Sequence, residues 1–91
     1  MNNARRKILR DAIKLCEEAK EKLELAESKV QECYDEEEEC YDNLPETLQD
    51  GSRGEAMETA MSAMEDFIDN VYSPNDDIDE LIGHLEEAID V

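Results

Sequence analysis

The residue types in this chain that could perform chemistry are one histidine, three cysteines and two dense groups of carboxylates. His84 lacks the Glu-x-x-His spacing of the di-iron sites found in helical bundles. The acidic group Asp76-Asp77-Ile78-Asp79-Glu80 lacks the loop glycine and the terminal Glu of a calcium-binding EF-hand. No glycine-rich phosphate loop is present, and no Ser or Cys is arranged with a His as an activated nucleophile. We therefore predict that the protein is not an enzyme and has no catalytic residues, no cofactor and no metal site.

The three cysteines, Cys16, Cys33 and Cys40, are separated by 17 and then 7 positions, unlike the close pairs of zinc sites. Two residues seven apart on one helix differ by about 10.5 Å in height, so Cys33 and Cys40 cannot form a disulfide with each other. We interpret all three as reduced thiols in the core of a cytoplasmic protein. A disulfide between two copies of the chain is the alternative.

The composition is strongly acidic, with 9 basic and 27 acidic side chains and a net charge of −18 at pH 7. Residues 1–29 contain eight basic and six acidic side chains, whereas residues 30–91 contain one basic and 21 acidic ones. Such a surface repels phosphate groups, so we expect no direct binding to nucleic acid and none to a membrane surface. No stretch approaches the run of about 20 apolar residues that a membrane span needs. The expected partner is a basic protein surface, for example that of a nucleic-acid-binding protein.

Two long amphipathic helices are expected to position these charges. In the first, seam residues recur at spacings of three and four, the heptad pattern of packed helices, at Leu9, Ala12, Cys16, Ala19, Leu23, Ala26, Val30, Cys33, Glu37, Cys40 and Leu44. The second helix has a similar seam at Met57, Met61, Met64, Ile68, Val71, Asn75, Ile78, Ile82, Leu85 and Ile89. Packing one seam on the other predicts an all-α fold, an antiparallel two-helix hairpin.

We expect a single helical-hairpin domain over residues 1–91. Its first helix covers about 4–43, a connection with a short helical turn covers about 44–52, and the second helix covers about 53–72 and continues over about 74–90. Ser52-Arg53-Gly54-Glu55 has the pattern of an N-terminal capping box for that second helix. Pro74 has no backbone N–H and its ring collides with the preceding turn, so the second helix should be kinked or broken near Ser73-Pro74.

A second apolar row follows the second helix beside its seam, at Ala60, Phe67, Pro74, Leu81 and Ala88. Two helices alone bury little apolar surface, so such a surplus favours self-association. The simplest arrangement is a homodimer that forms a four-helix bundle, with a contact through Ile8, Leu15, Phe67 and Leu81. The alternative is a seam that is merely broadened by helix curvature.

The acidic residues around the connection form the candidate surface for a partner. Its members are Asp35, Glu36, Glu38, Glu39, Asp42, Glu58, Glu65 and Asp66. A charge run of this kind can equally be an ordinary solvated face. Glu37 differs from its neighbours because it falls on the seam, where an unpaired carboxylate is costly to bury.

Four segments of the chain carry a resemblance to a known group of proteins: Tyr41-Asp42-Asn43-Leu44-Pro45-Glu46-Thr47-Leu48-Gln49, Gly54-Glu55-Ala56-Met57, Ile68-Asp69-Asn70 and Glu86-Glu87-Ala88-Ile89-Asp90. With these segments the chain resembles small acidic proteins encoded by Gram-positive bacteria and their phages. The most specific part is the Asn-Leu-Pro-x-x-Leu-Gln stretch, and the resemblance covers most of the chain after Tyr34. It implies a helical fold and a bacterial or phage origin, and it assigns no site residue. Ser73-Pro74 departs from the more uniform second helix of that group.

Two functions of different classes fit these features. The first is a non-enzymatic inhibitor whose carboxylates imitate nucleic-acid phosphates and block a basic cleft of a host or defence protein, as phage anti-defence proteins of similar build do. The second is a small structural or adaptor coiled-coil protein whose acidity only confers solubility. Both would act in the cytoplasm of a bacterial host.

Overall fold

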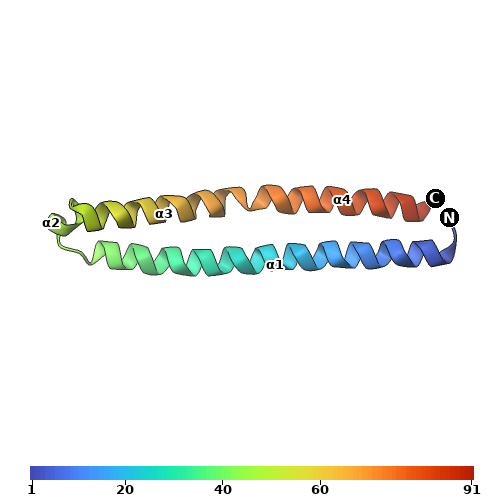
Figure 1. The fold of residues 1–91 in the computed structure, drawn as a ribbon, viewed down its shortest axis with the longest axis horizontal. Coiled ribbons are helices and arrows are strands. Elements are labelled where there is room, and N and C mark those ends of the chain that lie inside the picture. The colour runs from blue at the N-terminus through green and yellow to red at the C-terminus, as the bar shows by residue number, and fades with distance from the viewer. The chain divides into compact units, whose positions relative to one another are not determined.

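The computed structural model describes all residues, 1–91, and it is all-helical, with 90% of residues in helices and no strand. The helices are α1 (Asn3–Asp42), α2 (Glu46–Gln49), α3 (Ser52–Asn70) and α4 (Tyr72–Asp90) (Figure 1). The predicted all-α class is therefore confirmed. The chain forms two compact units: unit 1 comprises Met1–Leu25 and Tyr72–Val91, and unit 2 comprises Ala26–Val71.

α1 contains neither glycine nor proline, and most of its residues are strong helix formers such as Ala, Leu, Glu, Lys and Arg. Asn2 caps its N-terminus, because Asn2 Oδ1 accepts the backbone N–H of Arg5 at 2.9 Å. The first turn has no acidic residue and the last turn has no basic one, so the charges at both ends oppose the helix dipole. Packing against other helices is therefore the main source of stability for α1.

In unit 1, α4 runs antiparallel to the first part of α1, and the two chain termini lie at the same end (Figure 1). Arg6 Nε donates a hydrogen bond to the backbone carbonyl of Ile89 at 3.1 Å, and Lys20 Nζ forms an ion pair with Asp79 Oδ1 at 2.8 Å. A cation beside the last carbonyls of a helix is favourable, because they carry the negative end of its dipole. Arg6 thus interacts unfavourably with the dipole of α1, at whose N-terminus it lies, and favourably with the dipole of α4, at whose C-terminus it bonds.

In unit 2, α1 ends at Asp42, shortly before Pro45, whose ring disfavours a helical backbone in the preceding residue. Pro45 is the N-cap of α2, at whose end Gln49 Nε2 donates hydrogen bonds to the carbonyls of Tyr41 at 2.9 Å and Leu44 at 3.1 Å. The Tyr41 carbonyl lies in the last turn of α1, where helices leave four carbonyls without an intrahelical partner, and it also accepts the backbone N–H of Leu44 at 3.0 Å. The connection is thereby fixed, and α3 returns along the last part of α1 (Figure 1).

The contact between α2 and α3 requires a glycine at position 54. Gly54 is buried, and a Cβ atom built there would lie 1.9 Å from the carbonyl oxygen of Gln49. α3 begins at Ser52 with Gly51 as its N-cap, and no side chain bonds to this cap. The predicted capping box is therefore wrong: Ser52 already lies inside the helix, and the backbone N–H of Glu55 bonds to the Gly51 carbonyl.

One row of the predicted α1 seam is confirmed, and its companion row is wrong by one residue. The confirmed row is half-buried throughout, at Leu9, Cys16, Leu23, Val30, Glu37 and Leu44. In the predicted companion row Ala12 and Ala26 are half-buried, but Ala19, Cys33 and Cys40 are exposed. The regular half-buried row lies one position later, at Ile13, Lys20, Glu27, Tyr34 and Tyr41. The prediction followed apolar residue types, whereas these positions are mostly occupied by polar side chains.

The one-residue shift also changes the interpretation of the cysteines. All three are free thiols, and Cys16 is half-buried. Cys33 and Cys40 are exposed in unit 2, so their interpretation as core residues is wrong. Glu37, by contrast, does lie on the seam, where it is half-buried and takes part in no ion pair.

The predicted seam of the second helix is confirmed at every position, since all ten residues are buried or half-buried. The break in this helix falls at Val71, which separates α3 from α4, three residues before Pro74. The Val71 N–H still bonds to the Phe67 carbonyl at 3.0 Å. Pro74 cannot donate to the carbonyl of Asn70 and its ring crowds that group, so α3 ends at Asn70.

Candidate functional site

The eight carboxylates predicted to bind a partner all belong to unit 2, and all are exposed. Five lie on α1 and three on α3: Asp35, Glu36, Glu38, Glu39, Asp42, Glu58, Glu65 and Asp66. Unit 2 contains 15 acidic and 2 basic side chains, a net charge of −13, whereas unit 1 contains 12 acidic and 7 basic ones, a net charge of −5. The candidate site is therefore a set of exposed carboxylates on the more strongly acidic of the two units.

Two of these carboxylates are held by tyrosines of α1. Tyr34 Oη donates to Glu65 Oε1 at 2.6 Å, and Tyr41 Oη donates to Glu58 Oε1 at 2.5 Å. The hydrogen bond to Glu65, with a smaller contribution from Glu38, raises the pKa of the Tyr34 phenol far above its ordinary value. The bond to Glu58 likewise raises the pKa of the Tyr41 phenol. Both phenols therefore stay protonated, as neutral donors, at neutral pH.

Because these donors are neutral, they leave the charge of unit 2 unchanged. A lysine or arginine in either position would also hold its carboxylate, but it would cancel one negative charge. A tyrosine leaves the charge of its partner intact, and hydrogen bonds to a charged acceptor are short and strong. The pairs step by seven residues along α1 and by seven in the opposite direction along α3, from Tyr34 and Glu65 to Tyr41 and Glu58. The two hydrogen bonds thus join the two acidic helices of unit 2 without neutralising their carboxylates.

The charge density of Asp35–Asp42, the last eight residues of α1, is comparable to that of duplex DNA. Asp35–Asp42 carries six carboxylates in eight residues. At about 1.5 Å per residue this segment is about 12 Å long, which gives about one charge per 2 Å. Duplex DNA carries one negative charge per about 1.7 Å of its axis. A basic cleft that accepts a nucleic acid would meet a similar linear charge on this helix.

Sequence reasoning missed Tyr34 and Tyr41, the residues that organise the acidic surface. A usable signal was present in the spacing, because both tyrosines recur at seven residues and so do their partners Glu58 and Glu65. The apolar alternatives Cys33 and Cys40 stand directly beside them with the same spacing. Residue type alone therefore selected the wrong row.

An open depression of about 660 Å³ follows the surface of α3. Glu58 and Asp66, two of the predicted carboxylates, line it together with Glu55, Thr59, Ser62 and Ala63. Five of these six side chains are polar, unlike the mostly apolar lining of small-molecule sites. The depression is therefore open and polar, and it does not resemble an enclosed small-molecule site.

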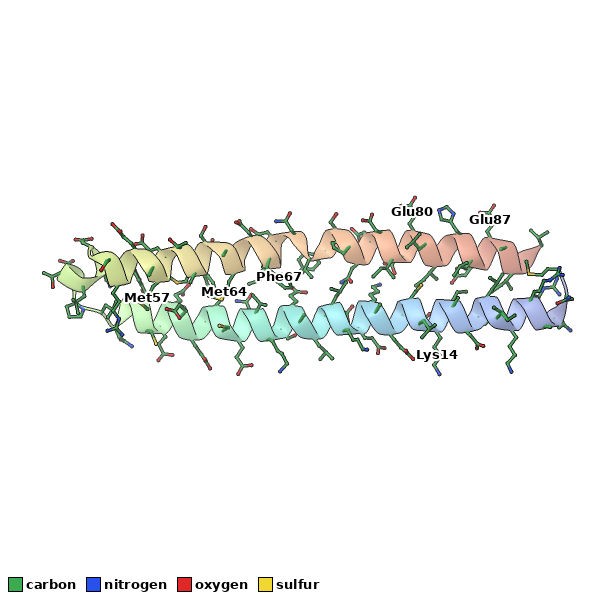
Figure 2. All side chains as sticks on the ribbon, viewed as in Figure 1. Lys14, Met57, Met64, Phe67, Glu80 and Glu87 are labelled. Atoms are coloured by element: carbon green, nitrogen blue, oxygen red, sulfur yellow. The ribbon has the colours of Figure 1, made fainter.

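The four residues predicted to mediate self-association are exposed, but they fall in different units. Ile8, Leu15 and Leu81 belong to unit 1 and are 65%, 65% and 56% exposed. Phe67 belongs to unit 2, is 39% exposed and extends from α3 on the side that faces α1 (Figure 2). The large apolar residues left exposed therefore gather mainly on unit 1.

The charges near the termini are arranged differently from those of unit 2. α4 contributes seven acidic and no basic side chains other than His84, and Met1–Leu25 contributes seven basic and five acidic ones. The hydrogen bond between Asp79 and Lys20 raises the pKa of the Lys20 ammonium above its ordinary value, which keeps this lysine charged. In unit 1 the bonds between helices therefore use cations.

The structure shows no group of three or more His, Cys, Asp or Glu side chains that could hold a metal ion. His84 is exposed on α4. None of the helices combines the length and the apolar character that crossing a membrane requires. No protein-family model matches the chain, and neither does any curated protein or solved structure.

Proposed function

We propose that this protein is a non-enzymatic acidic binding protein and that unit 2 docks on a basic surface of another protein. One observation carries the proposal: Tyr34 and Tyr41 hold the two helices of unit 2 together as neutral donors. If acidity served only to keep the protein in solution, cations in these positions would serve as well. The tyrosines instead preserve the net charge of −13 on one small unit. A field of one sign steers oppositely charged partners and raises their association rate.

Within this class, the finer proposal is an inhibitor of the phage type that imitates nucleic-acid charge. The support is the linear charge density of Asp35–Asp42, which is close to that of a DNA duplex. The protein would occupy the basic cleft of a host or defence protein and exclude the nucleic acid. The proposed compartment is the cytoplasm of a bacterial host.

A structural or adaptor protein is the second candidate, and the exposed apolar residues of unit 1 favour it. Ile8, Leu15 and Leu81 offer a contact that does not depend on charge. The two candidates predict opposite salt dependence. Electrostatic binding through unit 2 weakens as salt screens the charges, and apolar binding through unit 1 does not.

The test begins with a pull-down from a bacterial lysate at low and at high salt, followed by mass spectrometry and by binding isotherms with the purified partner. Two matched variants remove three charges each. The unit 2 variant carries Glu36→Gln, Glu38→Gln and Glu39→Gln. The unit 1 variant carries Glu86→Gln, Glu87→Gln and Asp90→Asn.

We expect the unit 2 variant to weaken binding by about tenfold, since exposed ion pairs contribute roughly 0.5 kcal/mol each. The unit 1 variant should change the affinity less than about threefold, and duplex DNA should compete with the wild type for the partner. Equal losses from both variants, or none from the unit 2 variant, would overturn docking through unit 2. Binding by unit 2 without competition from DNA would overturn only the nucleic-acid mimicry.

A further inference from the structure

Unit 1 buries little of its apolar surface by itself. Its buried residues are Ile82 and the polar Asn75, whose Oδ1 has no hydrogen-bond partner. Ile8, Leu15 and Leu81, in contrast, are each more than half exposed. A pair of helices with so small a core gains stability when another surface covers its exposed apolar residues.

The exposed apolar residues lie on one edge of the helix pair. The Lys20–Asp79 ion pair occupies the other edge, beside the seam. On α1, Ile8, Leu15 and Lys22 recur every seven residues and therefore share one face, next to the small residues of the Ala12 row. On α4, the corresponding face holds Asp77 and His84, next to Leu81 and Ala88, and Val91 follows directly after the last residue of the helix.

We propose that this edge of unit 1 binds a second copy of the chain, related by a twofold axis parallel to the helices. Such an axis sets α1 of each copy against α4 of the other, and both contacts are identical. The α1 segment of unit 1 has a net charge of +2, and the α4 segment has a net charge of −7. The two contacts are therefore attractive in charge as well as apolar.

The axis also determines which residues meet. Rotation about an axis parallel to the helices preserves height, so α1 of one copy meets α4 of the other in the register of the Lys20–Asp79 pair. Lys22 comes two residues after Lys20 on α1, and Asp77 comes two residues before Asp79 on α4. Lys22 of one copy therefore lies level with Asp77 of the second copy. In the same register Leu15 lies level with His84, and Ile8 lies level with the end of α4, which Val91 follows. Each contact would therefore contain the ion pair between Lys22 and Asp77 and apolar contacts of Leu15 and Ile8.

A twofold axis perpendicular to the helices is disfavoured on the same grounds. It would set α1 on α1 and α4 on α4. On this edge each α4 would present Asp77 to the other α4, which has no lysine or arginine to pair with it. Like charges placed opposite each other across an interface cost affinity.

Charge reversal tests the arrangement, with sedimentation equilibrium of the full chain as the measurement. Lys22→Glu and Asp77→Lys are measured singly and together. Lys14→Glu and Glu80→Lys are the matched controls, because Lys14 points away from α4 and Glu80 points away from α1 (Figure 2). Leu15→Asp tests the apolar part of the contact, and circular dichroism checks the folding of each variant.

We expect a dimeric wild type, and each interface reversal should raise its dissociation constant about tenfold relative to the matched control, since each substitution acts at two contacts. The double reversal should restore dimerisation to within about threefold of the wild type, and Leu15→Asp should abolish it. A wild type that stays monomeric at tens of micromolar would overturn the proposal. A dimer whose affinity the double reversal fails to restore would overturn it too, because the partner residues would then be different.

Discussion

The two units solve the same packing problem with different side chains. In each, a row of α1 that recurs every seven residues reaches the facing helix. In unit 1 the row supplies cations, with Arg6 bonded to the Ile89 carbonyl and Lys20 to Asp79. In unit 2 the same row supplies the phenols Tyr34 and Tyr41, which bond to carboxylates.

Because of this difference, the bonds that hold the helices together lower the negative charge of unit 1 but not that of unit 2. Cations join acidic helices by neutralising them, as in unit 1. Phenols join acidic helices and leave the carboxylates ionised, so unit 2 keeps a net charge of −13. This contrast is the basis of the two proposals, that the charge of unit 2 serves to bind a partner and that unit 1 mediates self-association.

The largest expected effect contrasts the glycines of the two units. A Cβ atom at Gly54 in unit 2 would lie 1.9 Å from the Gln49 carbonyl oxygen, so Gly54→Ala must displace α2 from α3. We expect a loss of about 2–3 kcal/mol in the free energy of unfolding. At Gly83 in unit 1 a Cβ atom would meet nothing within 4 Å, and Gly83→Ala should gain about 1 kcal/mol from helix propensity alone. Urea unfolding of both variants measures the contrast, and losses of similar size would contradict it.

A second prediction concerns the connection of unit 2. Gln49→Glu removes the two hydrogen bonds to the Tyr41 and Leu44 carbonyls and points a carboxylate at them. We expect a loss of about 2 kcal/mol in the free energy of unfolding, and Gln49→Met should lose less because it adds no charge. The carboxylate favours its neutral form beside two carbonyls, so the deficit of Gln49→Glu should shrink as the pH falls. A deficit that is independent of pH would show that charge is not its cause.

The connection and the seam of the second helix were largely predictable from the sequence. Of the two rows in the seam of the first helix, only one was predictable. The seam from Met57 to Ile89 could be identified because nearly every position on it is apolar and the period is unbroken. The companion row of α1 could not, since Lys20, Tyr34 and Tyr41 reach the facing helix through long side chains with polar ends. Residue type identifies the seam of a helix only where the buried side chains are apolar. Where hydrogen bonds hold the helices, the partner must be known before the row can be assigned.

The same reason explains what was predicted of the candidate site. The eight carboxylates could be selected from the sequence, because charged side chains that fall outside the seam of a helix are exposed, whereas Glu37 on the seam is half-buried. Their organisation by Tyr34 and Tyr41 could not, since a tyrosine on a helix gives no sign of which carboxylate it will meet. The break at Val71 shows a milder form of this limit. Proline predicts that a helix is interrupted, but the clash with the carbonyl four residues earlier decides where the helix ends.

The third prediction concerns the polar residue in the core of unit 1. Asn75 is 8% exposed, and its Oδ1 has no hydrogen-bond partner. Asn75→Leu removes this unsatisfied group at similar volume, so we expect a gain of about 1 kcal/mol in the free energy of unfolding. Asn75→Asp is the matched opposite, because it would bury a charge, and it should destabilise unit 1. Thermal unfolding of the two variants decides the point, and a loss from Asn75→Leu would mean that the amide makes a bond important for stability.

The smallest expected effect tests the phenols themselves. The bonds to Glu65 and Glu58 raise the pKa of Tyr34 and Tyr41 above the ordinary value of about 10. A group whose pKa is raised by folding contributes stability that is complete below its unfolded pKa and is lost as the pH rises through its folded pKa. The stability of the wild type should therefore fall as the pH rises above about 10.

Tyr34→Phe with Tyr41→Phe should remove the part of this alkaline loss that belongs to unit 2. The hydrogen bond to Asp79 also raises the pKa of Lys20, so an alkaline loss of the same sign remains in unit 1, and Lys20→Met should remove it. The tyrosinate absorbance provides an independent measure, since these two phenols should ionise at higher pH in the native protein than in urea. Ionisation at the same pH in both states would mean that the phenols do not hold the carboxylates. The acidic helices of unit 2 would then have to be joined in some other way, and the reason for assigning its charge to a partner would be lost.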